Sequence, residues 1–181
     1  MRTKHLAIGC AVATLLIAAN AKSAVVETAA NGFAVEETAH VAATPDKVYV
    51  ALLHPENWWN SQHTFSGNAA NLSLDAKAGG CLCETLPNGG SVQHLAVVAL
   101  MPGKAIVLRG AMGPFQAQGV DGAMTITLTP KDGGTDLVLD NNYGGYIKGG
   151  MGKWPVAADA MLSDLVARLK SYAETGKPAQ K

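Results

Sequence analysis

The stretch WPVAADAMLSDLVARLKSYAETG, from Trp154 to Gly176, decides the fold. Apolar side chains recur along it every three or four residues, at Ala158, Met161, Leu162, Leu165, Leu169 and Tyr172. This spacing predicts one long amphipathic helix with a single buried face. Pro155 suits the first helical position, and Gly176 followed by Pro178 is typical of a helix end.

The region before this helix alternates between β-prone runs and turn sequences. Turn residues at 87–90, 102–103 and 131–134 each separate two runs that favour strands. Such short connections join antiparallel neighbours, because a parallel pair needs a longer crossover. The sequence therefore predicts a meander of about six strands, preceded by a first strand at Phe33–Val41.

Two short helices are expected between the first strand and the meander. Thr44-Pro45-Asp46 is an N-cap followed by proline at the first helical position, and Pro55–Trp59 suggests a further helical turn. We therefore expect an α+β fold, in which an antiparallel sheet of about six to seven strands wraps around the long C-terminal helix. A cavity between sheet and helix is the natural ligand site of such a fold.

The N-terminus resembles an export signal. A short basic start precedes the apolar run Leu6–Ala19, and Ala19-Asn20-Ala21 matches a signal-peptidase site. The run is too short for a membrane span, which needs about 20 residues. We expect residues 1–21 to be a signal peptide, 22–30 a flexible leader, 31–177 the domain and 178–181 a tail. The protein would then be periplasmic or secreted, with a lipid anchor at Cys10 as the alternative.

The charge and length of the chain limit the classes of partner that the protein can bind. The whole chain has 14 Lys and Arg and 14 Asp and Glu. Residues 1–21 contain two of the cations and no acid, so the remaining 160 residues carry 12 against 14, a formal charge of −2. This length supports one domain with a real core. Scattered charges exclude the basic stripe of a nucleic-acid binder or membrane-surface protein, and no cofactor motif is present. A small molecule is the expected partner.

Local motifs add a resemblance to a known superfamily. They are Thr44-Pro45 with Val48, Pro55–Trp59, Ala78-Gly79-Gly80, Met101–Lys104, and the final helix with Leu165, Arg168, Leu169 and Gly176. Together they resemble the START-like superfamily, also called SRPBCC or helix-grip, over most of residues 33–177. The nearest branches look like polyketide cyclase/dehydrase-like proteins and homologues of the Hsp90-ATPase activator. The resemblance implies the helix-grip fold and leaves the activity open, because such folds host unrelated functions.

Aromatic and polar residues supply the candidate ligand contacts. Trp58 and Trp59 either plug the core under the short helix or stack on a ligand, with contact favoured for one of the two. His94 is either a buried, hydrogen-bonded histidine or a ligand-orienting base, and it shares strand parity with Val98. Arg109 points either outward or into the cavity, where it would bind a carboxylate.

The last candidates come from the C-terminal third of the chain. Tyr143 and Tyr146, in the glycine-rich segment before the last helix, are placed to close over a ligand. Met161 and Leu165 on the helix stripe are divided between core packing and ligand contact. The glycine cluster is not a phosphate-binding loop, because Ile147 stands where the first glycine is required. No catalytic triad or paired-carboxylate motif is present.

The paired cysteines leave three alternatives open. Cys81 and Cys83 project from the same strand face and are either two small buried hydrophobes, a disulfide, or metal ligands, in that order of preference. A disulfide suits an oxidising compartment, although an extended pair lies at the outer limit for bridging. A zinc set with His63 and His94 matches no known ligand spacing.

These observations favour an exported protein that binds a small apolar or amphipathic molecule between sheet and helix. The alternative is a cyclase/dehydratase-like cavity enzyme that uses His94, Arg109 or Tyr143 as acid–base groups. A third alternative, protein binding like that of the Hsp90 activator, conflicts with the signal peptide, because that partner is cytosolic.

Overall fold

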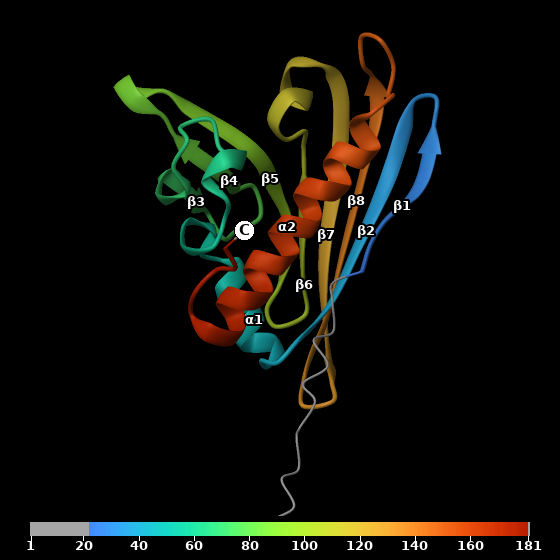
Figure 1. The fold of residues 1–181 in the computed structure, drawn as a ribbon. Helices are drawn as coiled ribbons and strands as arrows, with labels where there is room; N and C mark the ends of the chain where they lie inside the picture. Colours follow the sequence, from blue (N-terminus) through green and yellow to red (C-terminus); the bar gives the residue numbers. More distant parts are fainter. Residues whose placement is uncertain (1–21, 181) are drawn as a thin grey trace, which may run out of the picture.

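The computed structural model describes residues 22–180, and the expected signal peptide lies outside them. One antiparallel sheet of eight strands, in the order β1-β2-β8-β7-β6-β5-β4-β3, curves around the C-terminal helix (Figure 1). The strands are β1 (Lys22–Ala29), β2 (Gly32–Val41), β3 (Leu72–Leu74), β4 (Cys81–Thr85), β5 (Ser91–Met101), β6 (Ala105–Arg109), β7 (Gly119–Lys131) and β8 (Gly134–Tyr146). The helices are α1 (Pro45–Leu52) and α2 (Trp154–Thr175), with 3-10 turns η1 (Pro55–Asn57), η2 (Ser61–His63), η3 (Ala69–Asn71), η4 (Pro87–Gly89) and η5 (Gly113–Ala117).

Helix α2 crosses the inner face of the sheet, as its apolar stripe predicts (Figure 1). Leu162, Val166 and Leu169 are fully buried against the core. Burying one such side chain stabilises the fold by about 1.5–3 kcal/mol. Gly176 ends the helix in the left-handed conformation, with φ of 77°, and its N–H donates to the carbonyl of Tyr172. The predicted α+β helix-grip fold is confirmed.

The predicted turns and caps are also confirmed. Thr44 caps α1 by accepting a hydrogen bond from the backbone N–H of Lys47, and Pro55 begins η1. The three predicted turns join β4 to β5, β5 to β6 and β7 to β8, and each of these pairs is antiparallel. No helix within residues 22–180 is long and apolar enough to cross a bilayer.

The residues expected to be a flexible leader form a strand instead. Strand β1 pairs with β2 along its whole length, and Val25 packs against the core. Without β1 the edge of β2 would expose unpaired backbone groups, so pairing satisfies both segments. The side-chain pattern of residues 22–30 is too weak to predict this strand, which is stabilised by its pairing with β2. The sheet therefore has more strands than predicted.

Two bulges in β5 change which side chains face inward. Leu82 pairs with Leu95 and Cys83 pairs with Gln93, so His94 is an extra residue on β5. Both His94 and Leu95 are consequently buried. A second register shift, between Val97 and Ala99, leaves Val98 51% exposed. The parity that we predicted between His94 and Val98 is wrong, because alternation does not survive a bulge.

Candidate functional site

A pocket of about 740 Å³ lies between the first half of α2 and the inner face of the sheet. Its volume falls within the range of roughly 300–1,000 Å³ that is typical of small-molecule sites. Its lining comes from residues 59–65, strand β5, residues 112–117, strand β8 and α2: Trp59, Gln62, His63, Thr64, Phe65, His94, Met112, Gly113, Pro114, Phe115, Gln116, Ala117, Tyr143, Trp154, Ala157, Ala158 and Met161. Segments far apart in sequence therefore converge on one cavity.

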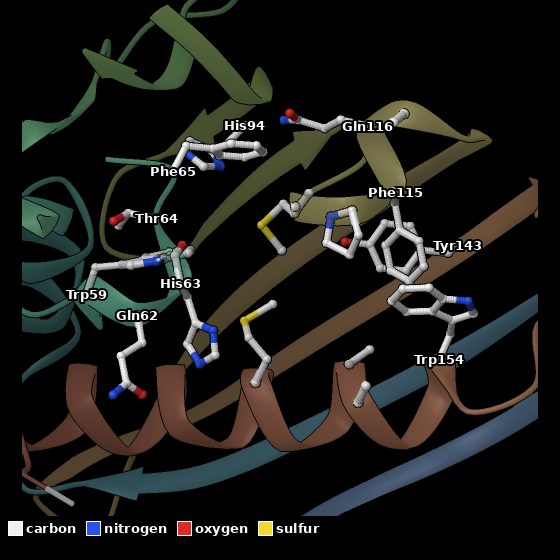
Figure 2. A pocket seen from close by; sticks show the side chains of 17 residues that line it. Trp59, Gln62, His63, Thr64, Phe65, His94, Phe115, Gln116, Tyr143 and Trp154 are labelled. Carbon is white, nitrogen blue, oxygen red and sulfur yellow. Dashed lines mark hydrogen bonds between the residues drawn. The ribbon is translucent and has the colours of Figure 1, made fainter. Parts of the chain in front are cut away.

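One end of the pocket is aromatic. Figure 2 shows Phe115, Tyr143 and Trp154 grouped beside the start of α2. The ring centroid of Phe115 lies 4.7 Å from that of Tyr143 and 5.0 Å from that of Trp154. Burial raises the pKa of the Tyr143 hydroxyl above its usual value, and contacts with the Asn141 side chain and the Met112 backbone only partly oppose this. We call Phe115, Tyr143 and Trp154 the aromatic end.

The opposite end holds a buried charged group. Nε2 of His94 lies 2.8 Å from Oε2 of Glu84, and both side chains are almost fully buried. The same carboxylate accepts hydrogen bonds from the backbone N–H groups of Phe65 and Ser66. Phe65 is 54% exposed, and its ring lies 5.8 Å from that of His94 (Figure 2). We call Glu84, His94 and Phe65 the polar end.

Hydrogen bonds favour the ionised form of the Glu84 carboxyl in spite of its burial. Burial by itself raises its pKa, but hydrogen bonds from Ser66, Phe65 and His94 outweigh this effect and lower the pKa below its ordinary value. A buried carboxylate is tolerated because its oxygens are occupied by donors. Glu84 thereby fixes both the imidazole of His94 and the backbone of residues 65–66.

Helix α2 holds residues 58–60, which lead into the loop that contains Phe65, by hydrogen bonds. Arg168 donates from Nε to the carbonyl of Trp58 and from an amino group to the carbonyl of Trp59. Nδ2 of Asn60 donates to Asp164 on the same helix at 2.7 Å. Residues 59–66, which we call the wall loop, are therefore held from two sides.

Four of the predicted contact residues line the pocket: Trp59, His94, Tyr143 and Met161. Trp58 is buried beside them but donates its indole N–H to the carbonyl of Ala51, which makes it the structural plug of the pair. Leu165 is buried in the core next to Trp58 and lies outside the main pocket. The expectation that one of the two tryptophans contacts the cavity agrees with this arrangement.

Two predicted contacts point away from the pocket. Arg109 is 67% exposed and forms an ion pair with Asp121, 2.9 Å from its carboxylate, on the neighbouring strand β7. The cavity-facing alternative for Arg109 is wrong, because this outward position keeps the guanidinium solvated and paired. Tyr146 is 71% exposed and lies at the end of β8, so Tyr143 alone of the two tyrosines lines the cavity.

The cysteine pair forms a disulfide, which was our second alternative. The Cα atoms of Cys81 and Cys83 lie 5.4 Å apart, closer than in an extended strand. The pair sits at the register shift opposite His94, where the strand is not regular. The first alternative, two unbridged hydrophobes, is therefore wrong. Neither sulfur is available as a thiolate for the zinc set, and no group of three or more metal donors occurs within residues 22–180.

Sequence reasoning missed Glu84, Phe65 and Phe115. Glu84 follows Leu82 by two residues, so a charge on the apolar face of β4 was a visible signal. Its link to His94 was not visible, because it depends on the bulge that turns His94 inward. Phe115 lies in a 3-10 turn with no periodic pattern, and Phe65 lies in the wall loop.

Comparison with solved structures gives the same fold. A conserved protein of unknown function from Enterococcus faecalis superposes with a TM-score of 0.59 at 13% identity, covering 88% of this chain and 80% of its own. CalU16 from Micromonospora echinospora gives a TM-score of 0.56 at 14% identity, covering 88% and 86%. A protein of the dynemicin biosynthetic locus gives 0.57 at 23% identity, covering 82% of this chain and 49% of its own.

Sequence comparison identifies the family. Curated proteins give no significant match. The family described as activator of Hsp90 ATPase homolog 1-like protein matches residues 42–174, from the residue after β2 to the last turn of α2. This match and the helix-grip fold agree with the START-like resemblance of the local motifs. The chain therefore belongs to the family of activator of Hsp90 ATPase homolog 1-like proteins, within the START-like superfamily.

Proposed function

We propose that this protein binds a small hydrophobic or amphipathic molecule in the pocket between α2 and the sheet. The observation that carries the proposal is the pocket itself, a cavity with an aromatic end and one buried polar group. Ligand sites combine such apolar walls with a few fixed polar atoms. The fold and the family support a ligand-binding or cyclase-type protein and leave the ligand to experiment.

A pair of matched helix substitutions tests this proposal. Ala157 and Val156 are adjacent and exposed on α2, but only Ala157 lines the pocket. Ala157→Trp should fill the cavity and weaken binding of the fluorescent probe N-phenylnaphthylamine by at least about tenfold, equivalent to about 1.4 kcal/mol. Val156→Trp should leave its affinity unchanged. Equal affinities for the two variants would place the probe elsewhere and contradict the proposal.

We also propose that the protein acts after export. The basic start, the apolar run Leu6–Ala19 and the small residues before Lys22 support a signal peptide. The Cys81–Cys83 disulfide supports an oxidising compartment, because disulfides persist there. N-terminal sequencing of protein from fractionated cells should read from Lys22 in the exported fraction; a cytoplasmic, uncleaved chain would refute export.

The second candidate function is a cyclase/dehydratase-like enzyme. The observation that favours it is the buried His94, held by an ionised carboxylate at the pocket wall, as a general base requires. Turnover of polyketide-like substrates should then fall by about 100-fold or more in His94→Phe. Turnover that is unaffected by this change, and by Tyr143→Phe, would leave the protein as a binder.

A further inference from the structure

The hydrogen bonds of Glu84 fix which nitrogen of His94 carries a proton. One carboxylate oxygen accepts from Ser66 N–H, and the other accepts from Phe65 N–H and from Nε2 of His94. An ionised carboxylate can only accept hydrogen bonds, so Nε2 must be the protonated nitrogen. In the neutral imidazole the lone pair then lies on Nδ1.

Nδ1 of His94 is left without a protein partner. The hydrogen bond to Glu84 is the only one that the His94 side chain makes within residues 22–180. The side chain is only 4% exposed, yet it lines the pocket. Nδ1 is not among the described side-chain atoms that are fully buried without a partner, so it keeps contact with the pocket that His94 lines, and a donor in that pocket would satisfy it. The polar end therefore presents one fixed acceptor to whatever molecule occupies the pocket.

The remaining lining selects the class of molecule that carries the donor. Among the described residues that line the pocket there is no Lys, Arg, Asp or Glu. A ligand carboxylate or phosphate would find no permanent cation, and a ligand amine no anion. The aromatic end offers rings to a flat apolar body, since tilted ring contacts are favourable. A neutral ring compound with a hydroxyl group meets both requirements.

We propose that the pocket recognises a neutral aromatic or enolic hydroxyl compound, whose O–H donates to Nδ1 of His94 while its ring packs towards Phe115, Tyr143 and Trp154. Glu84 acts as the positioning residue, because it holds His94 in the tautomer that can accept. This inference rests on the proposed binding function and adds the chemical group that the pocket selects.

The test uses naphthol and the methylnaphthalene in which a methyl group replaces its hydroxyl. Both are titrated by calorimetry against the wild-type protein and His94→Phe, which keeps a ring but removes both nitrogens. In the variant, the dissociation constant of naphthol should rise relative to that of methylnaphthalene by about 2- to 12-fold, the value of one neutral hydrogen bond. Arg109→Gln, on the outer face, is the control and should keep the wild-type ratio.

The outcomes separate this inference from the binding function. If methylnaphthalene binds wild type and the ratio is unchanged in His94→Phe, the pocket binds ring compounds but His94 does not select a hydroxyl. If neither compound binds wild type, both proposals fail. Should His94→Phe not fold, nitrogen NMR shifts of His94 in the wild-type protein decide: a proton on Nε2, with Nδ1 shifting on addition of naphthol, supports the inference. A proton on Nδ1 overturns it.

Discussion

The two ends of the pocket are held by different physical interactions. At the aromatic end, Phe115, Tyr143 and Trp154 from a 3-10 turn, a strand and a helix pack ring against ring. Such apolar packing is non-directional and tolerates changes of similar volume. At the polar end, one carboxylate joins strand β4, strand β5 and the wall loop through directional hydrogen bonds. A half-satisfied polar group is costly, so this end is either complete or lost.

The difference separates affinity from specificity. The aromatic end supplies area for any flat apolar ligand. The polar end has a single acceptor whose position and protonation depend on one residue, Glu84, so it can distinguish ligands of similar shape. Substitutions at the two ends should therefore differ in how they change stability. At the aromatic end the loss of stability should grow with the change in side-chain volume. At the polar end it should be abrupt and depend on pH.

The largest effect is expected at the polar end. Glu84→Gln places an amide nitrogen among backbone donors, so one donor loses its acceptor. The free energy of unfolding should fall by about 2–3 kcal/mol at pH 7, the value of hydrogen bonds to a charged group. Phe115→Leu at the aromatic end should cost less than about 1.5 kcal/mol. Urea denaturation of the two variants measures both; a larger loss in Phe115→Leu would contradict the comparison.

The same pair of variants should also differ in pH dependence. The pKa of Glu84 is lowered in the folded protein, so its contribution to stability is present above the unfolded pKa and is lost as pH falls through the folded pKa. The difference in free energy of unfolding between wild type and Glu84→Gln should therefore become smaller below the ordinary glutamate pKa of about 4.3. The difference in free energy of unfolding between wild type and Phe115→Leu should stay constant over the same range of pH, because this substitution alters no ionisable group.

The next effect concerns the disulfide beside the bulge. Replacing Cys81 and Cys83 by serine opens a loop of three residues, for which the chain-entropy estimate is about 1.5 kcal/mol. Because the bridge spans the register shift that turns His94 inward, its loss should disturb the polar end before the aromatic end. Amide NMR shifts should change most around His94 and Phe65 and least around Tyr143. Equal changes at both ends would show that the bridge does not position His94.

A smaller effect is expected from the tyrosine hydroxyl at the aromatic end. Tyr143→Phe removes one polar group and should change the free energy of unfolding by about 1 kcal/mol at neutral pH. Because burial raises the pKa of Tyr143, its contribution is present below the unfolded pKa and is lost as pH rises through the folded pKa. As pH rises above the ordinary tyrosine pKa of about 10, Tyr143→Phe should thus lose less stability than wild type, measured by thermal unfolding. Parallel curves would contradict burial of the hydroxyl.

The two ends also differ in how far the sequence predicts them. The long helix, the hairpins and the cap at Thr44 follow from periodicity and turn chemistry, which are local. Tyr143 was predicted because it is an aromatic residue in the glycine-rich segment before that helix. The Glu84–His94 pair was missed because it depends on a bulge, which shifts pairing by one residue without a sequence mark. Strand β1 was missed for a related reason, since its partner stabilises it.

The smallest effect is expected at Arg109, which belongs to neither end. Its ion pair with Asp121 is exposed, and such pairs contribute about 0–1 kcal/mol. Backbone N–H of Gly122 and the guanidinium of Arg109 lower the pKa of Asp121, but water screens this surface interaction. Arg109→Gln should therefore change the free energy of unfolding by less than about 0.5 kcal/mol and leave probe affinity unchanged. A loss of binding in this variant would mean that the outer face of the sheet communicates with the pocket, and the division into two independent ends would have to be abandoned.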